Sequence, residues 1–171
     1  MAFRKQKSNT TAIYFYIKNF ASFSYFELEE KLKMVEIAKG TYERYYEENV
    51  EEVMRALNMN YILRKAATIS TPRMEISEGD GGVWTIKTST TLKTMELTFR
   101  VGDPFDYVTV DGRNVSSLVT VEENKFICVQ TAKDENEKST KTIRDFTEHE
   151  CITTMEIIGT DIACVQKFKR V

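Results

Sequence analysis

The clearest pattern in the chain is the alternation of apolar and polar side chains over residues 83–101, which is broken once by a turn. A period of two, carried by β-branched and aromatic residues, predicts an antiparallel β-hairpin. One face of its first strand begins with Trp84 and Ile86 and continues with the hydroxyl groups of Thr88 and Thr90. A dry core rarely contains such hydroxyl groups, so this face is expected to line a cavity that holds water.

Similar short runs occur along the rest of the chain, and the turns between them are rich in Gly, Asp, Asn and Glu. We expect ten strands, at residues 40–46, 74–77, 84–92, 95–101, 107–110, 114–121, 126–132, 139–146, 152–158 and 162–170. Strands at this spacing, with helices only near the start, predict a mainly all-β fold. The expected architecture is an up-and-down antiparallel β-barrel with a helix-turn-helix lid, whose closure removes exposed sheet edges.

Two short helices are predicted after the first strand, at residues 50–57 and 61–67. Asn49 is expected to cap the first helix, with Glu52 completing a capping box. The apolar stripe of this helix consists of Val50, Val53, Met54 and Leu57. Helices of about two turns are unstable alone in water, so both are expected to pack on the barrel.

Residues 1–33 differ in character from the rest of the chain. A basic start leads into an aromatic stretch, as in a secretion signal, but Lys18 interrupts that stretch and no small-residue cleavage pattern follows. The segment is also too short and polar to span a bilayer. Three interpretations stay open: a disordered or weakly helical extension, a degenerate secretion signal, and a membrane-surface anchor. Met34 is an alternative start, and residues 34–171 are expected to form the single barrel domain.

Composition narrows the possible functions. The 171 residues carry 24 Lys and Arg against 26 Asp and Glu, a net charge of -2, so nucleic acid is not an expected partner. The one histidine, His149, lies in a polar turn, and no nucleophile motif or nucleotide-binding loop is present. We therefore expect neither an enzyme nor a cofactor or metal. Cys128, Cys151 and Cys164 lack metal-ligand spacing, which favours reduced, partly buried thiols in the cytosol.

A family resemblance covers residues 34–171. The stretch MVEIAKGTYERYYEENVEEVMRAL resembles the amino-terminal signature of the intracellular fatty acid-binding proteins. Further similar stretches follow in order: LRKAA, WTIKTSTTLKTMELTF, GDPFD, DGRNV, STKTIRDF and VQKFKRV. The resemblance implies a flattened ten-stranded barrel with a helical lid and a water-containing cavity for hydrophobic ligands. We therefore expect a monomeric cytoplasmic carrier of a fatty acid or similar lipid, or a secreted one if residues 1–33 act as a signal.

The stretch STKTIRDF contains the candidate for binding the ligand's head group. Alternation places Thr142 and Arg144 on one face, and from the residues alone Arg144 could be an exposed arginine paired with Asp145 or Glu148. The resemblance implies that Arg144 is the interior arginine that binds the ligand carboxylate, which it would do through two charge-assisted hydrogen bonds.

The last strand departs from the commonest family pattern. Many fatty acid binders have Arg-x-Tyr where this chain has Gln166 and Phe168, and retinol-binding relatives also have Gln-x-Phe but tend to lack the interior arginine. We favour a long-chain fatty acid, with a retinoid as the alternative, because a buried arginine without an anion is hard to explain.

Strand parity and the resemblance give the remaining ligand-binding candidates: Met54, Leu57, Met74, Leu92, Val110, Arg113, Gln130 and Thr142. The methionines and hydroxyl groups suit a cavity that adapts to different chains, although ordinary core packing is an equal alternative for each apolar residue. Trp84, Phe99 and Phe105 are expected in the packed base of the barrel.

Two features of the lid region complete the expectations. Arg44 and Val50 stand where the signature has an apolar residue and an aromatic one. Arg55, Arg64 and Lys65 on the lid are candidates for transient contact with anionic membrane, as in the family.

Overall fold

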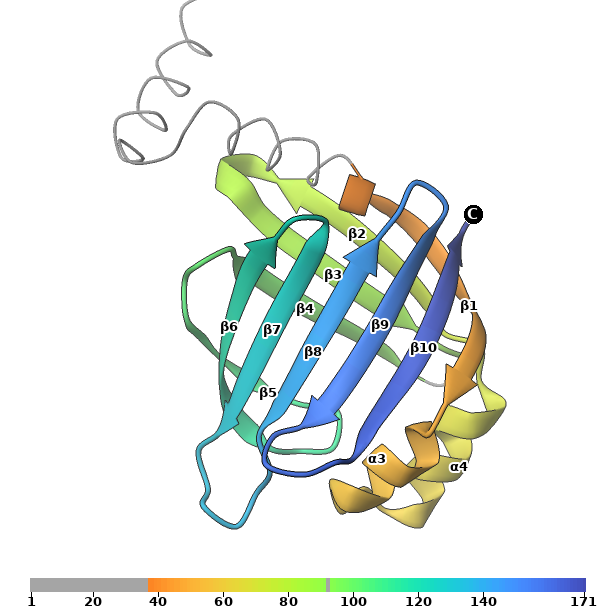
Figure 1. The fold of residues 1–171 in the computed structure, drawn as a ribbon, viewed down its shortest axis with the longest axis vertical. Coiled ribbons are helices and arrows are strands. Elements are labelled where there is room, and N and C mark those ends of the chain that lie inside the picture. The colour runs from red at the N-terminus through yellow and green to blue at the C-terminus, as the bar shows by residue number, and fades with distance from the viewer. Residues whose placement is uncertain (1–36, 92) are drawn as a thin grey trace, which may run out of the picture.

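The chain folds into one curved, ten-stranded antiparallel sheet (Figure 1). This architecture is seen in a computed structural model that describes residues 37–91 and 93–171. The strands are β1 (Gly40–Glu48), β2 (Arg73–Gly79), β3 (Val83–Ser89), β4 (Thr94–Arg100), β5 (Phe105–Val108), β6 (Asn114–Glu122), β7 (Lys125–Ala132), β8 (Thr140–Phe146), β9 (Glu150–Ile157) and β10 (Ala163–Arg170). Helices α3 (Val50–Ala56) and α4 (Tyr61–Ile69) and the 3₁₀ helix η1 (Asp80–Gly82) lie between β1 and β3. The predicted fold class is confirmed, and the expectations for residues 1–33 fall outside the described residues.

The strand order is β4-β3-β2-β1-β10-β9-β8-β7-β6-β5, so sequence neighbours pair everywhere except between β4 and β5, and β1 also pairs with β10. The end strands β4 and β5 are not paired with each other. The backbone that leaves β4 bonds to β6 instead, because the Gly102 N–H donates to the Val119 carbonyl at 2.8 Å. The barrel is therefore nearly closed, and the predicted full closure without edges is wrong.

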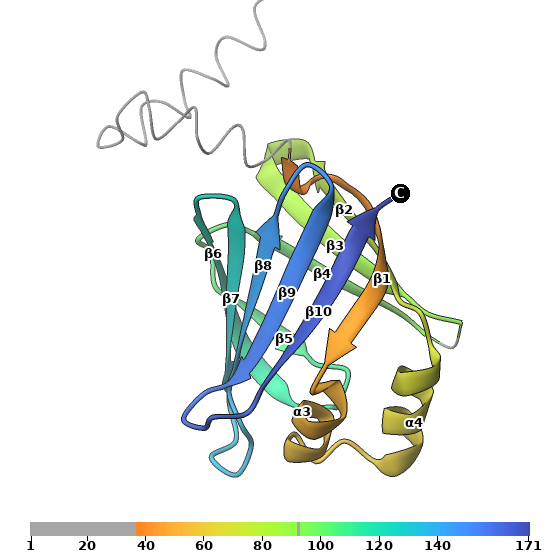
Figure 2. The same cartoon turned by 45° about the vertical axis from the view of Figure 1, so that its right-hand side comes forward.

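The two helices cover the end of the barrel at which β1 ends and β10 begins (Figures 1 and 2). The predicted Asn49 cap is wrong. Asn49 has a left-handed backbone, with φ of 58°, and its side chain makes no capping hydrogen bond. Asparagine tolerates this conformation, which turns the chain directly from β1 into α3. Asn60 is the residue that caps a helix, because its Oδ1 accepts from the Leu63 N–H at 2.9 Å.

Two strand boundaries also differ from prediction, and turn chemistry explains both. β5 begins at Phe105 and ends at Val108, because the backbones of Thr109 and Arg113 close a turn with a 3.0 Å hydrogen bond. β3 ends at Ser89, since Thr90 and Lys93 close the following turn through a 2.9 Å bond. The other strands lie close to their predicted ranges.

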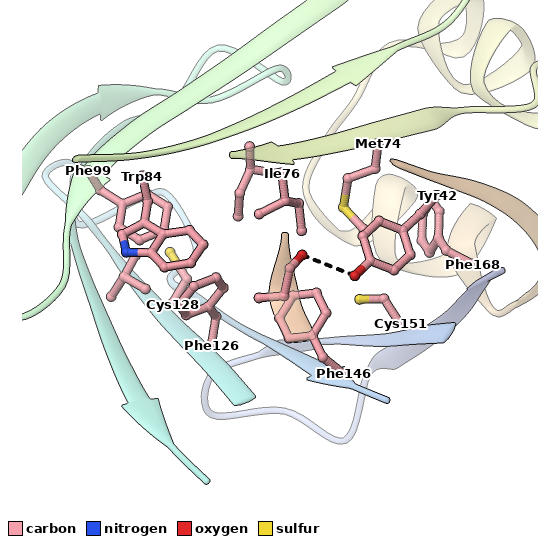
Figure 3. Close-up of a cluster of buried hydrophobic side chains, with 13 residues drawn as sticks. Tyr42, Met74, Ile76, Trp84, Phe99, Phe126, Cys128, Phe146, Cys151 and Phe168 are labelled. Atoms are coloured by element: carbon pink, nitrogen blue, oxygen red, sulfur yellow. Dashed lines mark hydrogen bonds between the residues drawn. The ribbon is translucent and has the colours of Figure 1, made fainter. Parts of the chain in front are cut away.

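An aromatic cluster fills the base of the barrel (Figure 3). Phe126 is fully buried at its centre, with ring centroids of Trp84, Phe146 and Phe99 at 4.9, 5.5 and 5.7 Å. Phe105 stacks on Phe99 at 6.3 Å. Edge-to-face contacts at such distances add to the free energy gained from burial. The prediction that Trp84, Phe99 and Phe105 pack in the base is confirmed.

The two ends of the described chain meet beside this cluster. Tyr42 is fully buried, and its hydroxyl donates to the Ala38 carbonyl at 3.0 Å (Figure 3). The same hydroxyl accepts from Arg170 at 2.8 Å. Arg170 also donates to the carbonyls of Lys39, at 2.6 Å, and Ile37. These bonds hold the start of β1 to the end of β10.

Alkaline pH is expected to destabilise the fold through Tyr42. Burial raises the pKa of this phenol from 10.0 to about 12, although Arg170 acts in the opposite direction. The folded chain therefore holds the proton more tightly than the unfolded chain does. This contribution to stability is complete below pH 10 and is lost as the pH rises towards 12.

In urea unfolding at pH 8–12, Tyr42→Phe should show a smaller alkaline fall in the free energy of unfolding. Tyr61→Phe, on the exposed lid, should match the parent, and an unchanged slope in Tyr42→Phe would contradict the expectation.

Candidate functional site

Arg144 points into the barrel from β8. Its neighbours at the same parity, Thr142 and Phe146, are buried, and its partners on the adjacent strands are Phe126 and Thr153. Asp145 faces the other way and lies 3.6 Å from Lys125. The exposed Arg144–Asp145 pair considered from the sequence is therefore not formed.

The Arg144 guanidinium has unused hydrogen-bonding capacity. Its Nε is buried and has no hydrogen-bond partner within the described residues. Burial raises the pKa of the Cys128 thiol and raises that of Cys151 to about 11, while the nearby positive charge of Arg144 lowers both. A buried donor left unpaired is costly, and a guanidinium satisfies a carboxylate through charge-assisted bonds. This geometry suits an anion.

Polar side chains extend from Arg144 across the wall. Thr153 on β9 pairs with Arg144, and Gln166 on β10 pairs with Thr153, so the three lie in one row. Arg144 and Gln166 are only half-buried although they face inward, which indicates that water can enter the barrel at this level. Phe168 is buried one row deeper, opposite Cys151. The residues at positions 166 and 168 thus supply one amide and no hydroxyl.

Tyr107 on β5 also faces the interior, and the sequence reasoning missed it. It pairs with the fully buried Val115, whereas its neighbour Val108 is 62% exposed. Burial raises the pKa of the Tyr107 phenol and Arg144 lowers it, so the phenol lies within the electrostatic reach of the guanidinium. The alternation of Phe105 and Tyr107 could have indicated this orientation. The predicted strand covered residues 107–110, however, and did not include Phe105.

Arg113 is held by the protein itself. Its side chain is buried, with Nε 2.5 Å from Asp111 Oδ2, and Nη1 donates to the Lys138 carbonyl. These contacts join the turn before β6 to the turn before β8. Unlike Arg144, Arg113 therefore has its charge compensated by a carboxylate of the chain.

The other predicted residues divide between the lid, the wall and the base. Met54 is buried on α3 and Leu57, the residue after α3, is half-buried, where they lie over the open end of the barrel. Gln130 and Thr142 face inward on β7 and β8. Met74 packs in the aromatic base cluster. Val110 lies in the turn after β5 and not in the predicted strand, and Leu92 is outside the described residues.

The lid presents apolar side chains to solvent. Ile62 and Ile69 on α4 are 78% and 83% exposed. Arg64 is tied to Glu51 of α3 by a 3.0 Å ion pair, and Lys65 lies over the Tyr61 ring. Membrane contact through the lid stays a prediction. Across residues 37–91 and 93–171, no helix is long and apolar enough to cross a bilayer.

Comparison with known proteins gives consistent matches. Residues 39–166 match the Lipocalin / cytosolic fatty-acid binding protein family. Human cellular retinoic acid-binding protein 1 is 40% identical over 134 residues, which cover 77% of this chain and 96% of that protein. Human cellular retinoic acid-binding protein 2 is 39% identical over 135 residues, with the same two coverages.

Solved structures of similar proteins share the fold. Echinococcus granulosus fatty-acid-binding protein 1 superposes with a TM-score of 0.73 at 28% identity, covering 80% of this chain and 98% of that one. The Schistosoma mansoni fatty acid binding protein in complex with arachidonic acid gives a TM-score of 0.72 at 27% identity, with coverages of 81% and 98%.

Proposed function

Because the chain belongs to the lipocalin and cytosolic fatty-acid binding protein family, we propose that it carries a long-chain fatty acid or another hydrophobic monocarboxylate. The observation that carries this proposal is the inward-facing Arg144, whose buried Nε lacks a hydrogen-bond partner within the described residues. A ligand carboxylate would satisfy that donor and compensate the charge. Thr153 and Gln166 supply neutral hydrogen-bonding groups in the same row.

Burial of the ligand tail supplies most of the affinity. Each buried methylene contributes about 0.8 kcal/mol, so a tail of roughly 12 buried carbons contributes about 10 kcal/mol before costs. Lost freedom of motion and desolvation of the head group remove several kcal/mol, which leaves roughly micromolar to nanomolar affinity. Tail burial thus sets the strength of binding, and Arg144 sets its orientation and its preference for anions.

A retinoid is the second candidate. The relatives at about 40% identity are named for retinoic acid, which also combines a hydrophobic body with a carboxylate. Gln166 and Phe168 would suit the neutral head group of retinol, but an alcohol would leave the Arg144 charge uncompensated. Among retinoids, the acid is therefore favoured over the alcohol.

The family membership supports the following proposal for the cellular role. The protein acts as a monomeric cytoplasmic carrier, without enzymatic activity or a bound cofactor, and exchanges ligand by brief membrane contact through α3 and α4. A secreted carrier is the alternative if residues 1–33 act as a signal. For the membrane step, transfer rates to vesicles should rise with anionic lipid content.

Native mass spectrometry of the purified full chain tests the ligand class. We expect co-purifying lipid, identified after extraction as a hydrophobic carboxylate. In competition assays on delipidated protein, palmitate or retinoic acid should displace a fluorescent fatty acid far better than hexadecanol or retinol. A protein that retains no lipid and binds none of the four compounds would contradict the carrier function.

A further inference from the structure

Besides Arg144, two charged side chains on β1 face the interior and contact each other. Arg44 and Glu47 form an ion pair with 2.5 Å between Nη1 and Oε2. The Arg44 side chain is 10% exposed and the Glu47 side chain 31% exposed, and Glu47 Oε2 is buried. The sequence does not predict this arrangement, because residues three apart on a regular strand point to opposite faces.

A β-bulge places both charges inside. The register between β1 and β10 shifts between Arg44 and Tyr46, so the two successive residues Tyr45 and Tyr46 both point outward, at 53% and 43% exposure. Arg44 then pairs with Phe168 and Glu47 pairs with Gln166, which both face inward from β10. Re-aiming side chains in this way is a common effect of bulges.

The pair lies at the depth of the head-group site. Glu47, Gln166, Thr153 and Arg144 occupy one continuous row across β1, β10, β9 and β8. Three inter-strand steps of about 4.8 Å separate the ends of the row, or about 14 Å along the curved wall. A ligand whose carboxylate is at Arg144 therefore has the first part of its chain close to the Arg44–Glu47 pair.

The chemistry of the pair selects a neutral oxygen group. A second anion would gain little, because Glu47 repels what Arg44 attracts. A bare methylene chain would displace water from both charged groups without replacing its hydrogen bonds, which is unfavourable. A hydroxyl group matches the pair, since it donates to the carboxylate and accepts from the guanidinium.

We propose that Arg44 and Glu47 form a second polar subsite, which binds a hydroxyl group on the ligand chain, so that the protein prefers a hydroxylated long-chain carboxylic acid to the unsubstituted acid. This inference rests on the proposed carrier function and narrows its ligand class. The carboxylate is held at Arg144 on β8, and the hydroxyl is held across the barrel at β1.

The same pair also contributes to the structure. Arg44 Nη2 donates to the Ser70 carbonyl at 2.5 Å, and the Arg44 N–H donates to the Pro72 carbonyl at 3.1 Å. These bonds tie β1 to the segment that follows α4. A test must therefore separate ligand preference from general weakening of the lid.

Competition assays on the delipidated full chain make that separation. Palmitate is compared with hydroxypalmitates that carry the hydroxyl at successive positions along the chain. We expect at least one isomer to bind at least fivefold more tightly than palmitate. In the double variant Arg44→Leu with Glu47→Ala, which keeps the net charge, that isomer and palmitate should bind within twofold of each other.

A matched control uses an outward ion pair that also starts from β1, between Glu43 and Arg73 of the neighbouring β2, at 3.1 Å. The variant Glu43→Ala with Arg73→Leu should keep the preference for the hydroxylated acid.

If the interior double variant does not fold, Glu47→Gln keeps the size of the side chain and should reduce the preference. The proposal is overturned if no isomer is preferred, or if the preference survives in the interior variants. If no carboxylate binds at all, the proposed carrier function fails together with this inference.

Discussion

Replacing Arg144 by alanine is expected to weaken the binding of a fatty acid by about 2–5 kcal/mol while leaving the matching alcohol nearly unaffected. The reason is that the inward-facing guanidinium, whose buried Nε has no hydrogen-bond partner among residues 37–91 and 93–171, can compensate a carboxylate. The alcohol makes no charged contact with it, so its affinity depends on tail burial. The loss corresponds to roughly 30-fold to several-thousand-fold in Kd.

Calorimetry with palmitate and hexadecanol on delipidated protein measures both affinities. Lys141→Ala removes a positive charge from the outer face of the same strand and should leave both ligands unaffected. The unfolding midpoint of Arg144→Ala should not fall in the ligand-free protein, because the variant removes an uncompensated interior charge. Equal losses for acid and alcohol would show that Arg144 does not recognise the head group.

The largest loss of stability is expected for Phe126→Ala, at about 3–5 kcal/mol in the free energy of unfolding. Phe126 is fully buried, and its ring meets those of Trp84, Phe99 and Phe146 within 5.7 Å. These neighbours belong to different strands, so they cannot collapse together to fill the space left by the ring. The cost therefore combines lost burial with a persistent cavity.

Urea unfolding of delipidated protein checks this expectation, because bound lipid would add to the stability of both proteins. Leu118→Ala, on the outer face of β6 with 37% exposure, should cost well under half as much. Phe126→Ala should also weaken fatty acid binding, since Phe126 is the cross-strand partner of Arg144. A loss below about 1 kcal/mol would show that the base is not closely packed.

Local alternation predicted most of the sheet correctly. Residues 84–89 and 126–132 were predicted as strands because side chains on a strand alternate between two faces, and the buried Trp84, Ile86 and Phe126 follow that parity. Parity failed wherever the backbone departed from a regular strand. β5 ends at Val108, before the turn at Thr109, so Tyr107 faces inward and Val110 lies outside the strand. Asn49 has a left-handed backbone, and its side chain does not cap α3 as expected.

The candidate site was also predicted only in part. The position of Arg144 on one face of its strand was readable, but its inward direction came from the family resemblance, because alternation alone does not distinguish inside from outside. The sequence did not reveal that Arg113 is neutralised by Asp111 and also bonded to the Lys138 carbonyl, since the second contact joins separate turns. The interior pair of Arg44 and Glu47 depends on a bulge that no periodicity signals.

The sequence by itself determined the number of strands, the helical lid and the aromatic base, because these follow from the spacing of apolar residues along short stretches. Only the tertiary structure decided that β1 pairs with β10, that β4 and β5 stay apart, and which charged side chains share the interior. These outcomes depend on hydrogen bonds and bulges between segments far apart in the chain. A local pattern of side chains cannot specify such long-range contacts.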